Sequence, residues 1–121
     1  MATNNKSSLR DRFYKWTLEL IKFIEGLPRD RVSDTISRQL IRSGTSILAN
    51  YVEGGSASSR KDFTNFLNHS LKSANESLLW LSLLKDTDKG NLEKNLVLSK
   101  ELGEIAKILA SSIIKLRANN K

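Results

Sequence analysis

The spacing of apolar residues in the middle of the chain predicts two long helices. Between residues 36 and 52, apolar side chains follow a spacing of three or four, at Ile36, Leu40, Ile47, Leu48, Tyr51 and Val52, with Gly44 at the step between Leu40 and Ile47. Residues 63–84 repeat this helical period, at Phe63, Phe66, Leu67, Leu71, Ala74, Leu78, Leu81 and Leu84. The polar segment Gly-Gly-Ser-Ala-Ser-Ser separates them. Because so short a connection lets two helices bury their apolar faces only side by side, we predict an antiparallel hairpin.

Amphipathic stretches on either side of this hairpin predict one further helix each. The first carries Phe13, Trp16, Leu20, Ile24 and Leu27 on one stripe, and the only proline follows it. We predict helices at about residues 9–27, 33–54, 59–85 and 91–117. Four such helices with short connections indicate an all-α domain over residues 9–118, an antiparallel up-down-up-down four-helix bundle. We expect residues 1–8 to be a flexible arm and residues 118–121 a frayed basic tail.

Local patterns also predict how the helices begin and which residues face inward. Ser33 is expected to cap the second helix and Ser59 the third, because serine hydroxyls accept hydrogen bonds from free amides in a first turn. The predicted inward positions of the last helix are Leu92, Leu96, Leu102, Ile105, Leu109, Ile113 and Leu116.

Small and apolar residues of the hairpin predict close contacts with other helices or other chains. Gly44 costs about 1 kcal/mol relative to alanine inside a helix, which favours a close approach of a neighbouring helix over a tolerated defect. Asn50 is expected to be a buried polar residue with partners on the next helix or the next subunit. Leu79, Trp80 and Leu83 extend the apolar surface beyond one face. We therefore predict a homo-oligomer with these five residues at its interface, the alternative being a monomer with an apolar patch.

Composition narrows the possible functions. The chain has 121 residues, no cysteine and one histidine, which excludes thiol redox chemistry and a Cys/His zinc site. Its start is polar and no stretch is apolar enough to span a membrane, so we expect a soluble cytoplasmic protein without a membrane partner. A net charge of +7 indicates RNA or DNA as a partner, although plain solubility is an alternative explanation.

Basic residues of the first and last helices form the candidate nucleic-acid interface. First and last helices are neighbours in an up-down bundle, so their cations can share one surface that holds phosphates without reading bases. Acidic residues interleave with them, and a solvated mixed-charge face is the alternative. The candidates are Arg10, Arg12, Lys15, Lys22, Lys94, Lys100, Lys107, Lys115 and Arg117.

The sequence contains no set of residues typical of catalysis. His69 has no carboxylate at helical spacing to orient it, and Gly54-Gly55 lacks the lysine of a phosphate-binding loop. Reflecting the hairpin about its turn instead pairs Glu76 with Arg38 and Glu53 with Lys61, so we predict two ion pairs between helices. We therefore expect no enzyme activity, no metal and no cofactor.

Three segments of the hairpin resemble a known bacterial family. They are Arg42-Ser-Gly-Thr-Ser-Ile-Leu-Ala-Asn-Tyr-Val-Glu-Gly54, Ser59-Arg-Lys-Asp-Phe63 and Glu76-Ser-Leu-Leu-Trp-Leu-Ser-Leu-Leu84. This pattern is similar to the four-helix-bundle proteins encoded in 23S ribosomal RNA intervening sequences, to which the accessory variability protein of diversity-generating retroelements is related. The resemblance implies a ring-like homopentamer with a basic surface. For the retroelement member it also implies binding to nucleic acid and to a reverse transcriptase.

Two hypotheses of function follow. The first is a non-enzymatic, oligomeric nucleic-acid-binding protein with little sequence selectivity. The second is a protein-interaction scaffold or accessory subunit that binds another polypeptide, such as a reverse transcriptase, through an acidic surface of that partner.

Overall fold

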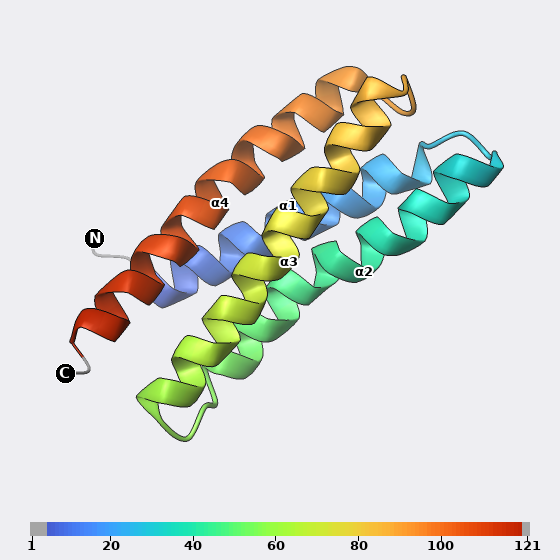
Figure 1. The fold of residues 1–121 in the computed structure, drawn as a ribbon. Coiled ribbons are helices and arrows are strands. Elements are labelled where there is room, and N and C mark those ends of the chain that lie inside the picture. Colours follow the sequence, from blue (N-terminus) through green and yellow to red (C-terminus); the bar gives the residue numbers. More distant parts are fainter. Residues whose placement is uncertain (1–4, 120–121) are drawn as a thin grey trace.

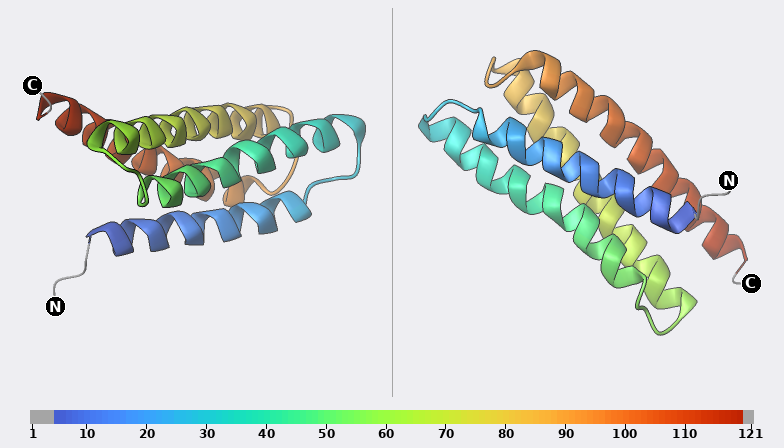
Figure 2. Two further views of the ribbon diagram at one scale, coloured as in Figure 1. Left: turned by 90° about the horizontal axis from the view of Figure 1, so that it is seen from below. Right: turned by 180° about the vertical axis from the view of Figure 1, so that it is seen from behind.

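The computed structural model describes residues 5–119, and these form four α-helices without a strand. They are α1 (Asn5–Glu25), α2 (Arg31–Gly54), α3 (Arg60–Asp86) and α4 (Leu92–Ala118). The helices alternate in direction, so both ends of the described chain and the α2–α3 turn lie at one end of the molecule (Figure 1). The α1–α2 and α3–α4 connections lie at the other end, and α1 packs between α2 and α4 (Figure 2). The predicted all-α four-helix bundle is confirmed.

The helix ends follow local capping chemistry, with one correction. Ser59 caps α3 as predicted, because its hydroxyl accepts a hydrogen bond from the Asp62 amide at 3.1 Å. The cap of α2 is Asp30, whose carboxylate accepts from the Ser33 amide at 2.8 Å. Ser33 itself is a buried residue of the first turn, so its predicted capping role was wrong. A carboxylate three residues upstream is the stronger acceptor at a positive helix end.

The first helix begins earlier than its apolar stripe predicts. Residues 5–8 belong to α1, although we expected them to form part of a flexible arm, while residues 1–4 lie outside the described part. Likewise, Ala118 is the last residue of α4 and Asn119 its C-cap, whereas the remaining two residues of the expected tail are not described. Helices therefore extend past the last residue that packs into the core.

One hydrophobic core runs the length of the bundle and receives side chains from all four helices. Phe13 and Tyr51 meet edge to face inside it, with ring centroids 4.8 Å apart. The buried apolar residues are Phe13, Trp16, Leu20, Phe23, Leu27, Leu40, Ile47, Tyr51, Leu67, Ala74, Leu81, Leu84, Leu98, Leu102, Ile105, Leu109 and Ile113. No helix within residues 5–119 is both long and apolar enough to cross a membrane.

The inward face of α4 differs from the prediction in its first two turns. Leu92 and Leu96 are 56% and 49% exposed, while Asn95 and Leu98 are buried. The Asn95 amide donates to the carbonyl oxygen of Leu81 at 2.9 Å, so a polar residue occupies the place expected for leucine. The prediction was wrong here because two overlapping sets of residues at the start of α4 both follow the helical period, one with Leu92 and Leu96 and one with Asn95 and Leu98. The contact with α3 buries the set that contains Asn95.

Small residues of α2 allow two neighbouring helices to approach closely. A Cβ atom at Gly44 would collide with Leu20 of α1, and Ser43 forms a 2.7 Å hydrogen bond with Ser77 of α3. Two more serines of α3 continue this polar seam, because Ser73 bonds to Ser46 and Ser70 donates to the carbonyl oxygen of Ile47. The predicted close helix approach at Gly44 is therefore present, and it is made within one chain.

The predicted ion pairs between α2 and α3 do not form. Glu76 accepts a hydrogen bond from the indole of Trp80 at 3.1 Å and makes no ion pair with Arg38. Glu53 is exposed and makes no ion pair with Lys61. The serine seam, rather than charge, sets the alignment of the two helices.

Candidate nucleic-acid interface

Charge is unevenly distributed along the bundle axis. The bundle can be divided at the midpoint of each helix. One half then holds both ends of the described chain and the α2–α3 turn, and it comprises residues 5–15, 43–73 and 105–119. This half carries ten basic and three acidic residues. We call it the basic half. Its cationic residues by position are Lys6, Arg10, Arg12, Lys15, Arg60, Lys61, Lys72, Lys107, Lys115 and Arg117, and its acidic ones are Asp11, Glu53 and Asp62.

The opposite half, residues 16–42 and 74–104, is close to neutral. It contains nine basic and ten acidic residues, and we call it the neutral half. Its basic residues are Lys22, Arg29, Arg31, Arg38, Arg42, Lys85, Lys89, Lys94 and Lys100, and its acidic ones are Glu19, Glu25, Asp30, Asp34, Glu76, Asp86, Asp88, Glu93, Glu101 and Glu104. The positive charge of the chain therefore lies at one end rather than along one pair of helices.

This distribution separates the candidates chosen from the sequence. Arg10, Arg12, Lys15, Lys107, Lys115 and Arg117 lie in the basic half. Lys22, Lys94 and Lys100 lie in the neutral half, among carboxylates. The antiparallel topology thus assembles a basic surface at the end of the bundle, whereas the sequence alone indicated a face formed by the first and last helices.

Arg12 is engaged by acidic residues of α4. Its guanidinium donates to both carboxylate oxygens of Glu101, at 2.6 and 2.8 Å, and contacts Glu104 at 3.4 Å. This bidentate hydrogen bond raises the pKa of Arg12 and lowers that of Glu101. Arg12 therefore ties α1 to α4, and its charge is already matched before any phosphate approaches.

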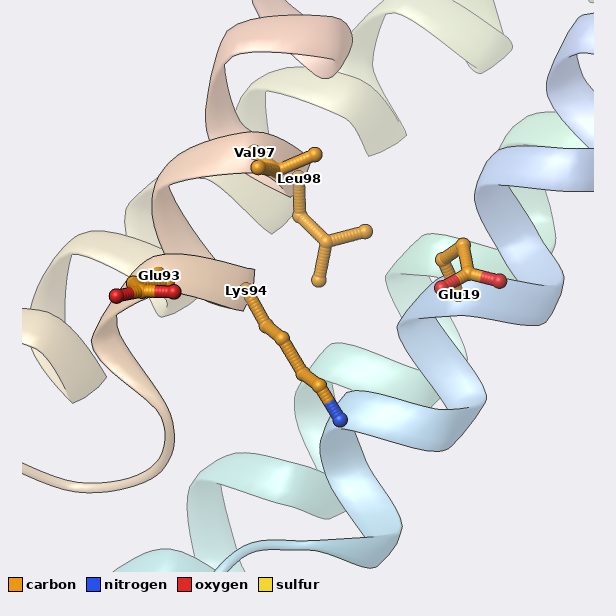
Figure 3. Close-up of a pocket in the computed structure, with 5 residues that line it drawn as sticks. All are labelled: Glu19, Glu93, Lys94, Val97 and Leu98. Carbon is orange, nitrogen blue, oxygen red and sulfur yellow. The ribbon is translucent and has the colours of Figure 1, made fainter.

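The α1–α4 seam in the neutral half is a mixed-charge hollow. A cavity of about 230 Å³ lies there, lined by Glu19, Glu93, Lys94, Val97 and Leu98, and the Lys94 side chain extends toward α1 (Figure 3). Glu19 also pairs with Lys22 at 3.3 Å. Because carboxylates share this surface with the two lysines, it lacks the surplus of positive charge that a polyanion requires.

Three basic residues of α3 were missed as interface candidates. Arg60 and Lys61 occupy the first turn of α3, beside the α2–α3 turn, and Lys72 follows three turns later. All three are exposed. The predicted hairpin and the alternating helices already place residue 60 at the same end as residues 9 and 117, which is a signal in the sequence for this group. The predicted ion pair with Glu53 removed Lys61 from the candidates.

The residues predicted at an oligomer interface fall into two groups. Leu79 and Leu83 are 53% and 39% exposed, and Trp80 is half-buried against the core. Gly44, in contrast, is buried between α1 and α2, so its place at an interface between chains was wrong. Asn50 is half-buried and donates to the carbonyl and hydroxyl oxygens of Ser46, one turn earlier on its own helix, rather than to another helix or subunit.

Most exposed large apolar side chains lie in the neutral half. Those of the neutral half are Leu18, Val32, Leu79, Leu83, Leu92, Leu96 and Val97, and those of the basic half are Tyr14 and Ile114. Leu79 and Leu83 end α3, and Leu92, Leu96 and Val97 begin α4, so these five flank the α3–α4 connection. The excess positive charge therefore lies at one end of the described bundle, and most of the exposed large apolar side chains lie at the other.

Comparison with known proteins places this architecture in a family. The family model described as 23S rRNA-intervening sequence protein matches residues 6–111, which include parts of all four helices. The chain belongs to this family. The resemblance seen in the hairpin motifs is thereby confirmed, and the match extends it to α1 and most of α4.

A solved structure supports the family assignment. A crystal structure of a protein of unknown function from the S23 ribosomal protein family of Bacteroides thetaiotaomicron is similar to this chain, with a TM-score of 0.80 and 36% sequence identity. The similarity covers 87% of this chain and 97% of that one. A comparison with curated proteins finds no significant match. The family thus explains the fold, and the function has to be argued from the surface.

Proposed function

We propose that this 23S rRNA-intervening sequence family protein is a non-enzymatic nucleic-acid-binding protein whose basic half contacts RNA or DNA phosphates. The observation that carries the proposal is the concentration of ten basic residues against three acidic ones in one half of the bundle. Like charges gathered at one end create a local potential that a balanced distribution would cancel. A polyanion is the partner that matches such a surface.

The geometry favours phosphate contacts over base recognition. The exposed cations Arg60 and Lys61 come from the start of α3, while Lys115 and Arg117 come from the end of α4. Lysine and arginine side chains at helix ends around the rim of a bundle can contact a phosphate backbone. They do not place any of the four described helices in a groove, where its side chains could recognise base edges. We therefore expect weak sequence selectivity and strong dependence on salt.

Binding of labelled RNA and DNA at several salt concentrations tests this function. The expected result is a complex at 50 mM salt whose affinity falls linearly, on logarithmic axes, as the salt concentration rises. RNA and DNA of unrelated sequence should bind within a fewfold of each other. Unchanged fluorescence anisotropy and unchanged gel migration of both nucleic acids at low salt would exclude the proposal.

We also propose that the protein self-associates through the neutral half, as a ring of five copies. Support comes from the exposed leucines that flank the α3–α4 connection, Leu79, Leu83, Leu92 and Leu96, which a neighbouring copy would cover. A ring would gather several basic halves and multiply their attraction for a polyanion. Light scattering should give a mass of about five times 13.6 kDa, and a 13.6 kDa particle at micromolar concentration would contradict self-association.

The second candidate function is that of an accessory subunit for another polypeptide. The same exposed leucines favour it, because apolar surface at the neutral half is available to a foreign protein as well as to a second copy. Affinity capture from the native host after nuclease treatment distinguishes the two. A polypeptide such as a reverse transcriptase retained without nucleic acid supports this second function, while partners lost with the nucleic acid support the first.

A further inference from the structure

A cavity of about 320 Å³ lies in the basic half, where all four helices meet. Leu9 comes from α1, Tyr51 from α2, Phe63 and Leu67 from α3, and the remaining lining residues from α4. Those of α4 are Leu109, Ser112, Lys115 and Leu116. The cavity is open to solvent rather than sealed, so a small molecule can enter it without unfolding the bundle.

The wall of this cavity is mainly hydrocarbon. Leu9, Leu67, Leu109 and Leu116 surround it together with Phe63, and the polar groups among its lining side chains are two hydroxyls and one ammonium. An apolar cavity of about 150 Å³ is already enough to bind benzene. The space here is about twice that size, which suits a flexible aliphatic chain.

Positive charge lies beside the opening. Lys115 lines the cavity, and Arg10 is close enough to Tyr51 for its charge to act on the phenol. Burial raises the pKa of Tyr51, and the positive charge of Arg10 opposes that shift in part, so the phenol remains a neutral hydroxyl near pH 7. None of the described residues that line the cavity carries a carboxylate.

We propose that this cavity binds an aliphatic carboxylate, with its chain among the four leucines and its carboxylate at Lys115. Apolar burial provides the affinity, and the cation at the rim selects an anionic head group over a neutral or positive one. The proposal does not depend on nucleic-acid binding, because the aliphatic chain enters the bundle and only Lys115 is shared with the proposed phosphate contacts. It would give the protein a small-molecule site at the end that we assign to polyanions.

Calorimetric titration with hexanoate, heptanoate and octanoate tests the apolar part of the proposal. Each added methylene should lower the dissociation constant about fourfold until the cavity is full, since burying one contributes about 0.8 kcal/mol. Octanol and octylammonium, which differ from octanoate in the head group, should bind at least tenfold more weakly. Absence of octanoate binding at millimolar concentration, or equal binding of octanol, would overturn the proposal.

Two matched pairs of variants locate the site. Ser112→Phe fills the cavity, and the control Ser111→Phe adds the same ring at an exposed neighbouring position. Lys115→Gln removes the cation at the rim, and the control Lys100→Gln removes an exposed lysine of the neutral half. We expect octanoate affinity to fall at least tenfold in Ser112→Phe and about fivefold in Lys115→Gln, with both controls unchanged.

Circular dichroism and thermal melting establish that each variant is folded. If Ser112→Phe does not fold, Ser112→Leu fills less of the cavity and replaces it, with Ser111→Leu as its control. If a folded cavity-filling variant and Lys115→Gln both bind octanoate as tightly as the wild-type protein does, the ligand binds elsewhere. RNA binding measured on Ser112→Phe separates this result from the proposed function, since that change fills the cavity and keeps every cation of the basic half.

Discussion

The basic half and the neutral half of this bundle are built from the same four helices, yet they expose different chemistry. The basic half has a large surplus of cations and exposes the large apolar residues Tyr14 and Ile114. The neutral half balances its charges and exposes four leucines and Val97 around the α3–α4 connection. An antiparallel bundle can therefore separate two surfaces along its axis while one core continues through both. We propose polyanion binding at one end and self-association at the other.

The strongest test of this comparison removes the same amount of positive charge from each half of the bundle. Replacing Lys61, Lys107 and Arg117 by glutamine removes three exposed cations of the basic half. We expect RNA affinity at low salt to fall roughly 100-fold, at about 1 kcal/mol for each contact in water. The slope of log affinity against log salt should decrease by about 2 for single strands.

A second triple variant serves as its control, because Arg29, Arg31 and Arg38 are exposed cations of the neutral half. Replacing them by glutamine changes the net charge equally and should change RNA affinity by less than threefold. Equal losses in the two triple variants would show that total charge, rather than its position along the axis, determines binding.

The neutral half is tested by making its apolar surface charged. Leu79→Glu combined with Leu96→Glu places two carboxylates where exposed leucines flank the α3–α4 connection. Burying an unpaired charge in an interface costs several kcal/mol, so the proposed assembly should dissociate to a single chain of 13.6 kDa in light scattering. Ile114→Glu, at a 66% exposed position of the basic half, should leave the mass unchanged. A mass unaffected by the double variant would place the contact elsewhere.

Buried hydrogen bonds allow the two halves to be compared in stability. Asn95→Ala in the neutral half removes the amide that donates to Leu81 and leaves a small void, so we expect a loss of about 2–3 kcal/mol in the free energy of unfolding. Ser70→Ala in the basic half removes one hydroxyl bond to Ile47 and should cost about 1 kcal/mol. Urea denaturation measures both. A larger cost for Ser70→Ala would reverse the predicted order.

The smallest expected effect concerns the ion pair that joins the two halves. Arg12 of the basic half binds Glu101 of the neutral half, and this contact lowers the pKa of Glu101. The stabilisation is therefore complete above the ordinary glutamate pKa of 4.5 and is lost as the pH falls through the lower pKa of the folded state. Because both side chains are about one third exposed, we expect it to contribute about 0.5–1 kcal/mol.

Glu101→Gln tests that contact in two ways. Urea denaturation should show the loss of stability at pH 7 and much less of it at pH 3, where the wild-type carboxylate is protonated more fully. The same change frees the Arg12 charge, so RNA affinity should rise about twofold to threefold. A pH-independent difference in stability would mean that packing, rather than the ion pair, holds the two helices together.

Local chemistry explains which features were predictable from the sequence. The apolar period identified the hairpin and the four helices, and Ser59 was correctly identified as a cap because capping involves residues three positions apart. Gly44 also signalled a close helix contact, since a glycine in mid-helix has a cost that packing must offset. The interface prediction for Gly44 failed because the sequence does not specify whether the approaching helix belongs to the same chain.

Contacts between distant segments explain the features that were missed. Arg12 was chosen as a free cation, but its carboxylate partners on α4 are 89 and 92 residues away. The predicted pairs of Glu76 and Glu53 failed because the serine seam fixes the alignment of α2 and α3. Neither result can be calculated from the spacing of residues along one helix.

The sequence by itself determined the helices, their order and their alternating directions, because each depends on the period of apolar residues and on short connections. Only the tertiary structure decided which of two overlapping stripes of α4 faces the core, and it placed Asn95 inward and Leu92 and Leu96 outward. It also decided which cations are already paired and which remain exposed at the basic end. The physical reason is that burial and ion pairing depend on all four helices at once, whereas helix formation depends on neighbours within a few residues.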